Sequence, residues 1–318
     1  MKEPLDASAA SLALMTAAFW GGIVVAVKFS EDTLPPIAVA AIRFALAGVF
    51  MWIWCRFRHL PLAPSRSELR PAVFVALLLL VQILLFNFAI HYSNTSHAVL
   101  LISTYVGWVA IIEHFFTKAD QLTPRKVGGI GLAAVGVGLT VFGMGNGQTG
   151  VTETSSADLP TLFGDVLMLL SAFVLGIKIV FTKYAVARVE PNKLIFWHHW
   201  IGSSLFAMSS LLTEDLSQTA QYDVWTMPVI LALLYQGLVV GRICFAVQAV
   251  LLQRHTATSI AVFGFATPLF GVLFALVFRG DPYSHWLLVA GVCVALGIYL
   301  VNRSSSQSRT DSESGRSV

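Results

Sequence analysis

Residues 18–28, AFWGGIVVAVK, and residues 172–182, AFVLGIKIVFT, are two versions of one apolar segment in opposite halves of the chain. A second pair follows in the same order, AIHYSNTSHAVLLIST at residues 89–104 and VLLQRHTATSIAVFGFATP at residues 250–268. Each copy then closes with a short acidic turn and a glycine-rich apolar segment. Internal repetition on this scale fixes the architecture. It predicts two repeats of membrane-length segments, an arrangement typical of secondary transporters.

The composition is that of a membrane protein. Charged residues make up 12% and hydrophobic residues 56% of the chain, and the mean hydropathy is +0.76. A water-soluble domain of this size cannot cover so much apolar surface, so we expect a lipid bilayer around it. The basic residues are spread over loops, which argues against a nucleic-acid partner. Cys55, Cys244 and Cys293 fit neither zinc spacing nor a disulfide framework, and we expect no metal and no cofactor.

A membrane-spanning helix needs about 20 predominantly apolar residues. Windows of that length fall at residues 9–29, 37–55, 72–92, 97–117, 125–143, 163–183, 192–212, 227–249, 257–278 and 284–302. We therefore expect an all-α membrane protein with ten transmembrane helices in two five-helix repeats, 9–143 and 162–303. The hydrophilic residues 144–161 would form an external linker. Residues 304–318 lack apolar periodicity and are expected to form a disordered cytoplasmic tail.

The distribution of lysine and arginine predicts the orientation, because these residues remain in the cytoplasm near helix ends. With the N-terminus inside, the inner loops and tails receive fifteen of them, and the outer loops receive only Lys28 and Arg279. Both termini are therefore expected to be cytoplasmic, in the inner membrane if the cell is bacterial. Five helices per half is an odd number, so the second repeat must be inverted relative to the first, as alternating access requires.

The chain resembles the drug/metabolite transporter superfamily, specifically its EamA-type members with ten helices. The marks of the resemblance in the first half are Trp20-Gly21 with Lys28, Arg43-Phe44, residues 89–96, and Asp120 where the family usually has glutamate. Those in the second half are Gly164-Asp165, residues 234–237 (LYQG), Thr267-Pro268, residues 280–282 (GDP) and residues 297–303 (GIYLVNR). Tyr105 departs from the pattern, because it stands where the family has a proline in helix four. The resemblance implies transport of small metabolites, commonly amino acids or related solutes and often outward.

Ionisable residues inside the bilayer are functional candidates by default, because a charge there costs at least about 2.5 kcal/mol. Lys178 and Arg242 each lie about 6 Å to the cytoplasmic side of mid-helix, and Glu113 lies about 9 Å to that side, at a rise of about 1.5 Å per residue. These three residues are therefore expected to form a charged cluster that faces one cavity and binds a carboxylate. Glu113 would serve as charge partner or proton-coupling group. Alternatively, Lys178 reaches the inner interface and Glu113 lies at the headgroup boundary.

Further candidates are polar or aromatic. Trp20, Asn87, Tyr105 and Gln236 are expected to contact substrate, or else to pack and hydrogen-bond between helices. Pro268 is a candidate hinge, because a proline within a helix frees a backbone carbonyl.

Two other intramembrane groups of polar residues are expected to be structural. His198 and His199 face about 100° apart on a helix, which is unfavourable for a chelate. Arg43 is expected to anchor the outer end of its helix beside Glu31 or Asp32.

The function predicted from these observations is secondary transport, with export as the expected direction, of a small-molecule solute such as an amino acid. A proton or another coupling ion is the expected driving partner, because no nucleotide-binding motif is present. A membrane-embedded enzyme remains an alternative, although no nucleophile–base pair is visible and we expect no catalytic residue. A second alternative is a channel-like facilitator without gradient coupling. Small residues spaced by four, such as Gly129/Ala133 and Gly291/Ala295, permit close helix packing and a homodimer face.

Overall fold

The computed structural model describes residues 5–31, 33–92, 101–118, 120–145, 162–217, 224–279 and 286–314. These residues form helices joined by turns and include no β-strand. The first half contains α1 (Ala7–Glu31), α2 (Pro36–Phe57), α3 (Arg66–Tyr92), α5 (Tyr105–Ile112), the π-helix η1 (Glu113–Thr117) and α6 (Pro124–Gly145). The fold is thus all-helical, as predicted.

The second half follows with a similar order of elements. It contains α7 (Leu162–Ala185), α8 (Pro191–Thr213), α9 (Met227–Leu234), the π-helix η5 (Tyr235–Cys244), α10 (Phe245–Arg254), α11 (Ala257–Ala261), the 3₁₀-helix η6 (Val262–Ala266), α12 (Thr267–Arg279) and α13 (Trp286–Ser314). The segments α9, η5 and α10 are continuous in sequence, and so are α11, η6 and α12. Each run therefore forms one long helical path with an irregular middle.

Local sequence signals explain where several helices begin. Pro36 and Pro191 occupy the first turns of α2 and α8, where the missing N–H of proline leaves no hydrogen bond unmade. Glu190 precedes α8, and its carboxylate accepts a hydrogen bond of 2.7 Å from the backbone N–H of Lys193. Thr256 caps α11 in the same way by accepting from the N–H of Ser259.

Six helical stretches among the described residues are both long enough and apolar enough to span a membrane. They are Ala7–Glu31, Pro36–Phe57, Arg66–Ala89, Leu162–Ala185, Met227–Arg254 and Ala257–Phe274. The other windows, 97–117, 125–143, 192–212 and 284–302, also fall largely on helical residues, and their crossing of the membrane stays a prediction. The expected linker 144–161 lies almost wholly outside the described residues.

The C-terminal segment differs from expectation. Residues 304–318 were expected to be disordered, but α13 continues through Ser314. The physical reason lies in the sequence, because the first glycine or proline after Asn302 is Gly315 and no helix breaker interrupts the polar extension.

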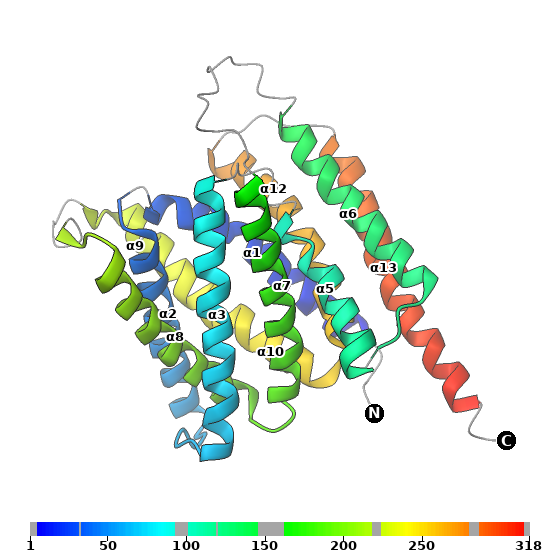
Figure 1. Ribbon diagram of the computed structural model, residues 1–318, viewed down its shortest axis with the longest axis horizontal. Coiled ribbons are helices and arrows are strands. Elements are labelled where there is room, and N and C mark those ends of the chain that lie inside the picture. Colours follow the sequence, from blue (N-terminus) through cyan, green and yellow to red (C-terminus); the bar gives the residue numbers. More distant parts are fainter. Residues whose placement is uncertain are drawn as a thin grey trace.

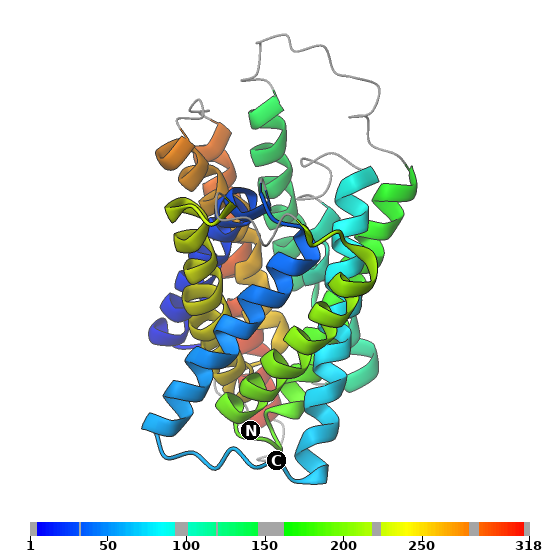
Figure 2. The same ribbon diagram turned by 90° about the vertical axis from the view of Figure 1, so that its left-hand side faces the viewer.

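Helices from the two halves pack against one another throughout the bundle. The pairs are α1 with α12 and with η5, α3 with α7 and with α8, α2 with α8 and with η5, α5 with α7, and α6 with α13. Figure 1 shows α6 and α13 side by side along one flank of the molecule. Figure 2 shows α2 on the opposite flank, facing the viewer. The largest apolar core lies between them and includes Val106 and Val109 of α5 and Ile179 and Val180 of α7.

The α6–α13 pair is a close-packed seam built on glycine. A Cβ added at Gly297 of α13 would lie 2.5 Å from the carbonyl oxygen of Gly129 and 2.7 Å from the Cβ of Ala133, both on α6. Gly291, on the same helix as Gly297, has nothing within 4 Å of its added Cβ. The Gly129/Ala133 pair therefore serves packing within the chain, while the homodimer face stays a prediction.

Candidate functional site

Basic and aromatic side chains from four helices meet inside the bundle. We define the basic–aromatic cluster as Arg43 and Phe44 of α2, Lys178 of α7, His198 and His199 of α8, and Phe245 of α10. The Nζ of Lys178 lies 5.0 Å from the centroid of Phe245, and the Cζ of Arg43 lies 5.1 Å from that of Phe44. Both separations are within the range of cation–π attraction. The rings of Phe44 and His199 are stacked at 5.6 Å, and His198 lies 5.6 Å from Phe245.

Several polar atoms of this cluster have no protein partner. Both ring nitrogens of His198 are buried without a hydrogen bond, and so are the Nδ1 of His199 and the Nε of Arg43. The Nε2 of His199 lies 2.8 Å from the carbonyl oxygen of Gly241 in η5, which fixes the orientation of that ring. Most buried polar atoms in proteins are hydrogen-bonded, so this concentration of exceptions at one place marks the cluster.

The charges of the cluster are also unbalanced. Lys178 is 7% exposed, and none of the ion pairs among the described residues includes it. Arg43 lies close enough to Lys178 for their positive charges to repel. Arg43 itself lies within electrostatic reach of Glu31, one of the two partners expected for it; Asp32 lies outside the described residues. A buried cation without a partner is costly, so the cluster favours an added anion.

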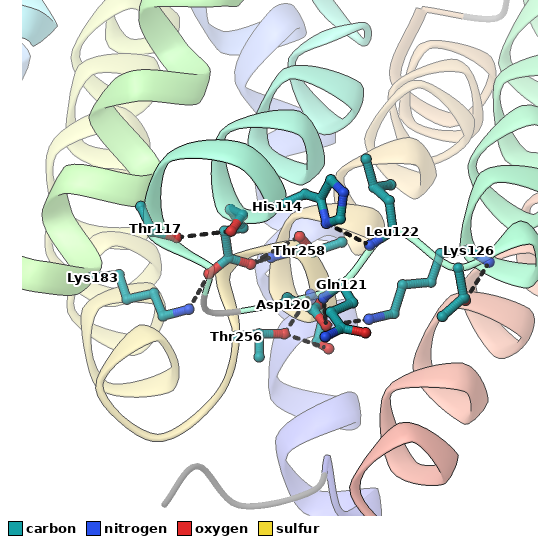
Figure 3. Close-up of polar contacts among 12 residues, drawn as sticks. His114, Thr117, Asp120, Gln121, Leu122, Lys126, Lys183, Thr256 and Thr258 are labelled. Carbon is teal, nitrogen blue, oxygen red and sulfur yellow. Dashed lines mark hydrogen bonds and ion pairs between the residues drawn. The ribbon is translucent and has the colours of Figure 1, made fainter. Parts of the chain in front are cut away.

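Glu113 forms a second site, nearer one end of the bundle. Its carboxylate is fully buried and pairs with the ammonium of Lys183 of α7. It also accepts hydrogen bonds from the backbone N–H of Thr258 of α11 at 2.7 Å and from the Thr258 hydroxyl at 2.8 Å. Figure 3 labels Lys183 and Thr258, which bond this carboxylate from α7 and α11. We call Glu113, Lys183 and Thr258 the carboxylate clasp, because they join the first half of the chain to two elements of the second.

Another ion pair lies next to the clasp. Lys126 of α6 is 1% exposed and pairs with Asp120, and both lie beside the clasp in Figure 3.

Two further polar contacts join the halves. Lys193 at the start of α8 pairs with Glu68 at the start of α3 at 2.9 Å, and the Glu68 side chain is 25% exposed. At the opposite end of α8, the carboxylate of Glu214 accepts hydrogen bonds from the backbone N–H groups of Ile37 and Ala38 at 2.7 and 2.8 Å. These bonds join the end of α8 to the start of α2.

The three ionisable residues that were expected to face one cavity make different contacts in the structure. Lys178 belongs to the basic–aromatic cluster, whereas Glu113 belongs to the carboxylate clasp. The clasp contacts α7 at Lys183, which is five residues after Lys178. This offset corresponds to about 7.5 Å along a helix axis. The guanidinium of Arg242 lies 4.1 Å from the ring centroid of Trp54. Substrate contact by these residues stays a prediction.

The other predicted residues lie between helices. The amide nitrogen of Gln236 donates to the hydroxyl of Ser30 at 2.9 Å, which joins η5 to α1. The hydroxyl of Tyr105 donates to the carbonyl oxygen of Ala261 at 3.3 Å, and a Cβ at Gly264 would overlap that hydroxyl. Trp20 meets Phe245 edge to face at 6.0 Å, at the margin of the cluster. Asn87 is half-buried in α3.

Pro268 is the second residue of α12, the helix that directly follows the 3₁₀-helix η6. The helical path is thus irregular beside the predicted hinge, and hinge motion stays a prediction. Tyr105, at the start of α5, hydrogen-bonds Ala261 beside this irregular stretch. In the expected repeats, α5 corresponds to the path α11–η6–α12. These two segments therefore touch each other close to the turn at residues 103–104 in one and to η6 in the other.

Sequence reasoning missed the partners of these residues. His198 and His199 were expected to be structural, yet they carry three of the unpaired nitrogens of the cluster. The available signal was the position of two ionisable residues near the middle of an apolar segment. Lys183 and Thr258 gave no comparable signal, because each lies near a helix end where polar residues are common. Among the described residues, no group of His, Cys, Asp and Glu could hold a metal ion.

A comparison of the sequence with protein families agrees with this architecture. The model of the EamA-like transporter family matches residues 7–142 and 162–303. The chain therefore belongs to the EamA-like transporter family and is an integral membrane protein.

Similar proteins are named as transporters. An "Uncharacterized transporter" of Archaeoglobus fulgidus is 25% identical over 93% of this chain and 98% of its own length. A "Probable amino-acid metabolite efflux pump" of Salmonella typhimurium is 25% identical over 91% of this chain and 93% of its own length. A crystal structure of another protein shares the fold, with a TM-score of 0.78 at 15% identity over 95% of this chain and 99% of that one.

Proposed function

We propose that the protein is a secondary transporter that exports a small metabolite, an amino acid or related organic solute, by alternating access between two inverted five-helix repeats. The repeats are residues 9–143 and 162–303, joined by the external linker 144–161. The relative named as an amino-acid metabolite efflux pump supports the class of solute and the direction. The uneven distribution of lysine and arginine supports cytoplasmic termini.

The packing pairs support the inverted repeats. We number the expected spans one to ten in chain order and exchange span one with six, two with seven, and so on. The contact of α1 with η5 then becomes that of α7 with α3, and α1 with α12 becomes α7 with α5. The pairs α2–α8 and α6–α13 become themselves. A set of contacts that is unchanged by this exchange is expected when two repeats are related by a pseudo-two-fold axis.

The observation that carries the proposal is the carboxylate clasp. In the proposed orientation it lies at the cytoplasmic end, where the C-terminal end of α7 meets η1 and α11. A buried ion pair adds little stability over an apolar contact, because desolvation offsets its attraction. A buried ion pair is better suited to a contact that must form and break during transport. Alternating access requires such a contact, since the halves must separate at one end while they close at the other.

The clasp also suggests how a coupling proton could act. A proton on Glu113 would remove the charge that holds Lys183 and leave the carboxyl with Thr258 alone. The cytoplasmic end would then open more readily. In this scheme Glu113 couples proton binding to opening and does not itself contact the solute.

The test combines a flux assay with a reversible lock. Cys55, Cys244 and Cys293 are replaced by alanine, and Glu113 and Thr258 are changed to cysteine in the full-length chain. The protein is reconstituted into vesicles loaded with a mixture of labelled amino acids and hydroxy acids. We expect release of at least one solute, arrest of that release by a short thiol-reactive cross-linker, and recovery when the cross-linker is cleaved by reductant.

The controls separate the alternatives. The single-cysteine chains Glu113→Cys and Thr258→Cys receive the same cross-linker and should keep their own rates. In the native chain, which keeps Glu113, solute movement that never exceeds its own gradient under an imposed pH gradient would indicate a facilitator. Release that continues at full rate through the locked protein would contradict alternating access at this end.

A further inference from the structure

The basic–aromatic cluster has a role that the clasp does not fill. It lies on the expected spans two, six, seven and eight, so side chains from both proposed repeats form it. His198 and His199 are fully buried, while Arg43 and Phe245 are partly exposed. Burial within the cluster thus decreases from the histidines toward Arg43 and Phe245.

The unpaired atoms of the cluster are mostly able to donate. The Lys178 ammonium and the Arg43 Nε–H are donors only, and a neutral His198 carries one N–H donor and one acceptor. The N–H of a neutral His199 already donates to the Gly241 carbonyl oxygen, so the Nδ1 of His199 is an acceptor. No carboxylate of the described residues forms an ion pair with Lys178. The missing partner is thus an acceptor with negative charge, for which charge-assisted hydrogen bonds are the strong ones.

We propose that the basic–aromatic cluster binds the carboxylate of an organic anion and selects such anions, for example 2-hydroxy acids, over zwitterionic amino acids. Lys178 supplies the charge, and His198 and Arg43 supply N–H donors. The inference rests on the proposed function, because a solute site at the contact of both repeats is what alternating access would expose to each side in turn.

Rejection of the amino acid follows from the same geometry. The ammonium group of an amino acid lies next to its carboxylate, so it would approach Lys178 and Arg43. Aromatic faces could otherwise hold that ammonium. However, the Phe245 face already holds Lys178 at 5.0 Å, and the Phe44 face already holds Arg43 at 5.1 Å. A hydroxyl at the same carbon carries no charge and suffers no repulsion.

The experiment uses matched ligands that differ only at that carbon. The probes are lactate and alanine, 2-hydroxyisocaproate and leucine, and phenyllactate and phenylalanine. Binding to the purified full-length protein in lipid nanodiscs is measured from the ligand-dependent rise in unfolding temperature. We expect at least one hydroxy acid to bind with a Kd at least about 10-fold lower than that of its amino acid, a difference of about 1.4 kcal/mol.

Two substitutions assign the effect to the cluster. Lys178→Gln should weaken binding of the hydroxy acid at least about 10-fold, while Lys178→Arg should retain most of it. His198→Phe keeps an aromatic ring in an aromatic setting and removes two nitrogens that bond nothing in the protein. The fold should tolerate it, and hydroxy-acid binding should fall. Arg188→Gln, at an exposed position just after α7, removes a cation outside the cluster and should change nothing.

The outcomes are distinct. Hydroxy acids that bind no better than their amino acids, fail to bind at all, or bind Lys178→Gln and His198→Phe as well as the native chain would each overturn the inference. Because the assay needs no gradient and no flux, it can succeed in a protein that does not transport. Conversely, vesicle flux of amino acids that is insensitive to Lys178→Gln would support the proposed function and refute this selectivity.

Discussion

At the level of single residues, the carboxylate clasp allows a stability prediction. Glu113→Gln leaves an oxygen for Thr258 but leaves the buried ammonium of Lys183 without its counter-charge. Breaking a buried pair on one side costs about 3–5 kcal/mol, so the unfolding temperature of the purified protein should fall clearly. The double variant Glu113→Gln/Lys183→Met removes the stranded charge and should recover most of the loss.

A more exposed pair provides the comparison. Glu68 and Lys193 form an ion pair in which Glu68 is 25% exposed, and such pairs contribute about 0–1 kcal/mol. Glu68→Gln should therefore lower the unfolding temperature much less than Glu113→Gln does. Equal losses for the two substitutions, or no rescue by Lys183→Met, would mean that the clasp is not a buried pair in the membrane-embedded protein.

The same residues show how far the sequence could predict a site. Lys178 and Glu113 were singled out because charge inside an apolar helix is costly. Their partners were not, because the partner depends on how each helix is rotated and tilted, which hydropathy does not record. Arg242 lies at a similar depth to Lys178 along its helix, yet its guanidinium packs on Trp54. The depth of a side chain in the membrane can be counted from the sequence. The direction in which that side chain points around its helix depends on the positions of the neighbouring helices.

At the level of elements, the α6–α13 seam predicts that two glycines of one helix differ in tolerance. Gly297→Ala places a methyl group 2.5 Å from the Gly129 carbonyl oxygen and should force the helices apart. Overpacking of this kind costs about 1–3 kcal/mol. Gly291→Ala meets nothing within 4 Å and should leave stability unchanged. Thermal unfolding and the membrane level of both variants test this, and equal behaviour would contradict the seam.

Helix positions were predictable, but helix irregularities were not. The window 227–249 is mostly apolar, and its polar residues Gln236 and Arg242 did not predict that α-helical turns of α9 give way to π-helical turns in η5. The interruption at η6 had a partial signal in Pro268, which marked the region within a few residues. Tyr105 stands where the family has a proline, and even without that proline residues 103 and 104 form a turn before α5.

At the level of the whole molecule, topology is the prediction to test. In a chain without its native cysteines, Ser155→Cys in the linker should react with a membrane-impermeant maleimide on intact cells. Ser306→Cys near the C-terminus should react only after permeabilisation. The physical reason is the excess of lysine and arginine on the side of the termini. The reverse labelling pattern would require the opposite orientation, and equal labelling of both positions would contradict an odd number of spans between linker and terminus.

The echo of residues 18–28 in residues 172–182 predicts two repeats, and the model of the EamA-like transporter family likewise matches the chain in two stretches. The contacts between the halves were not predictable in the same way. Gln236, for example, was expected either to contact substrate or to hydrogen-bond between helices, and its amide joins η5 to Ser30 of α1. A polar group in an apolar segment must find a partner, but sequence alone does not distinguish a neighbouring helix from a ligand.

The bond between His199 and the backbone of η5 has an evolutionary consequence. The imidazole is oriented by the carbonyl oxygen of Gly241 at 2.8 Å, and every amino acid supplies such a carbonyl. Substitutions at that position therefore keep the acceptor, and only those that fit beside Ala47 keep the helix in place. Loss or gain of one residue within Tyr235–Cys244 would instead rotate Phe245 by about 100° relative to Tyr235. Relatives that handle different solutes are thus expected to differ here in segment length more than in residue identity.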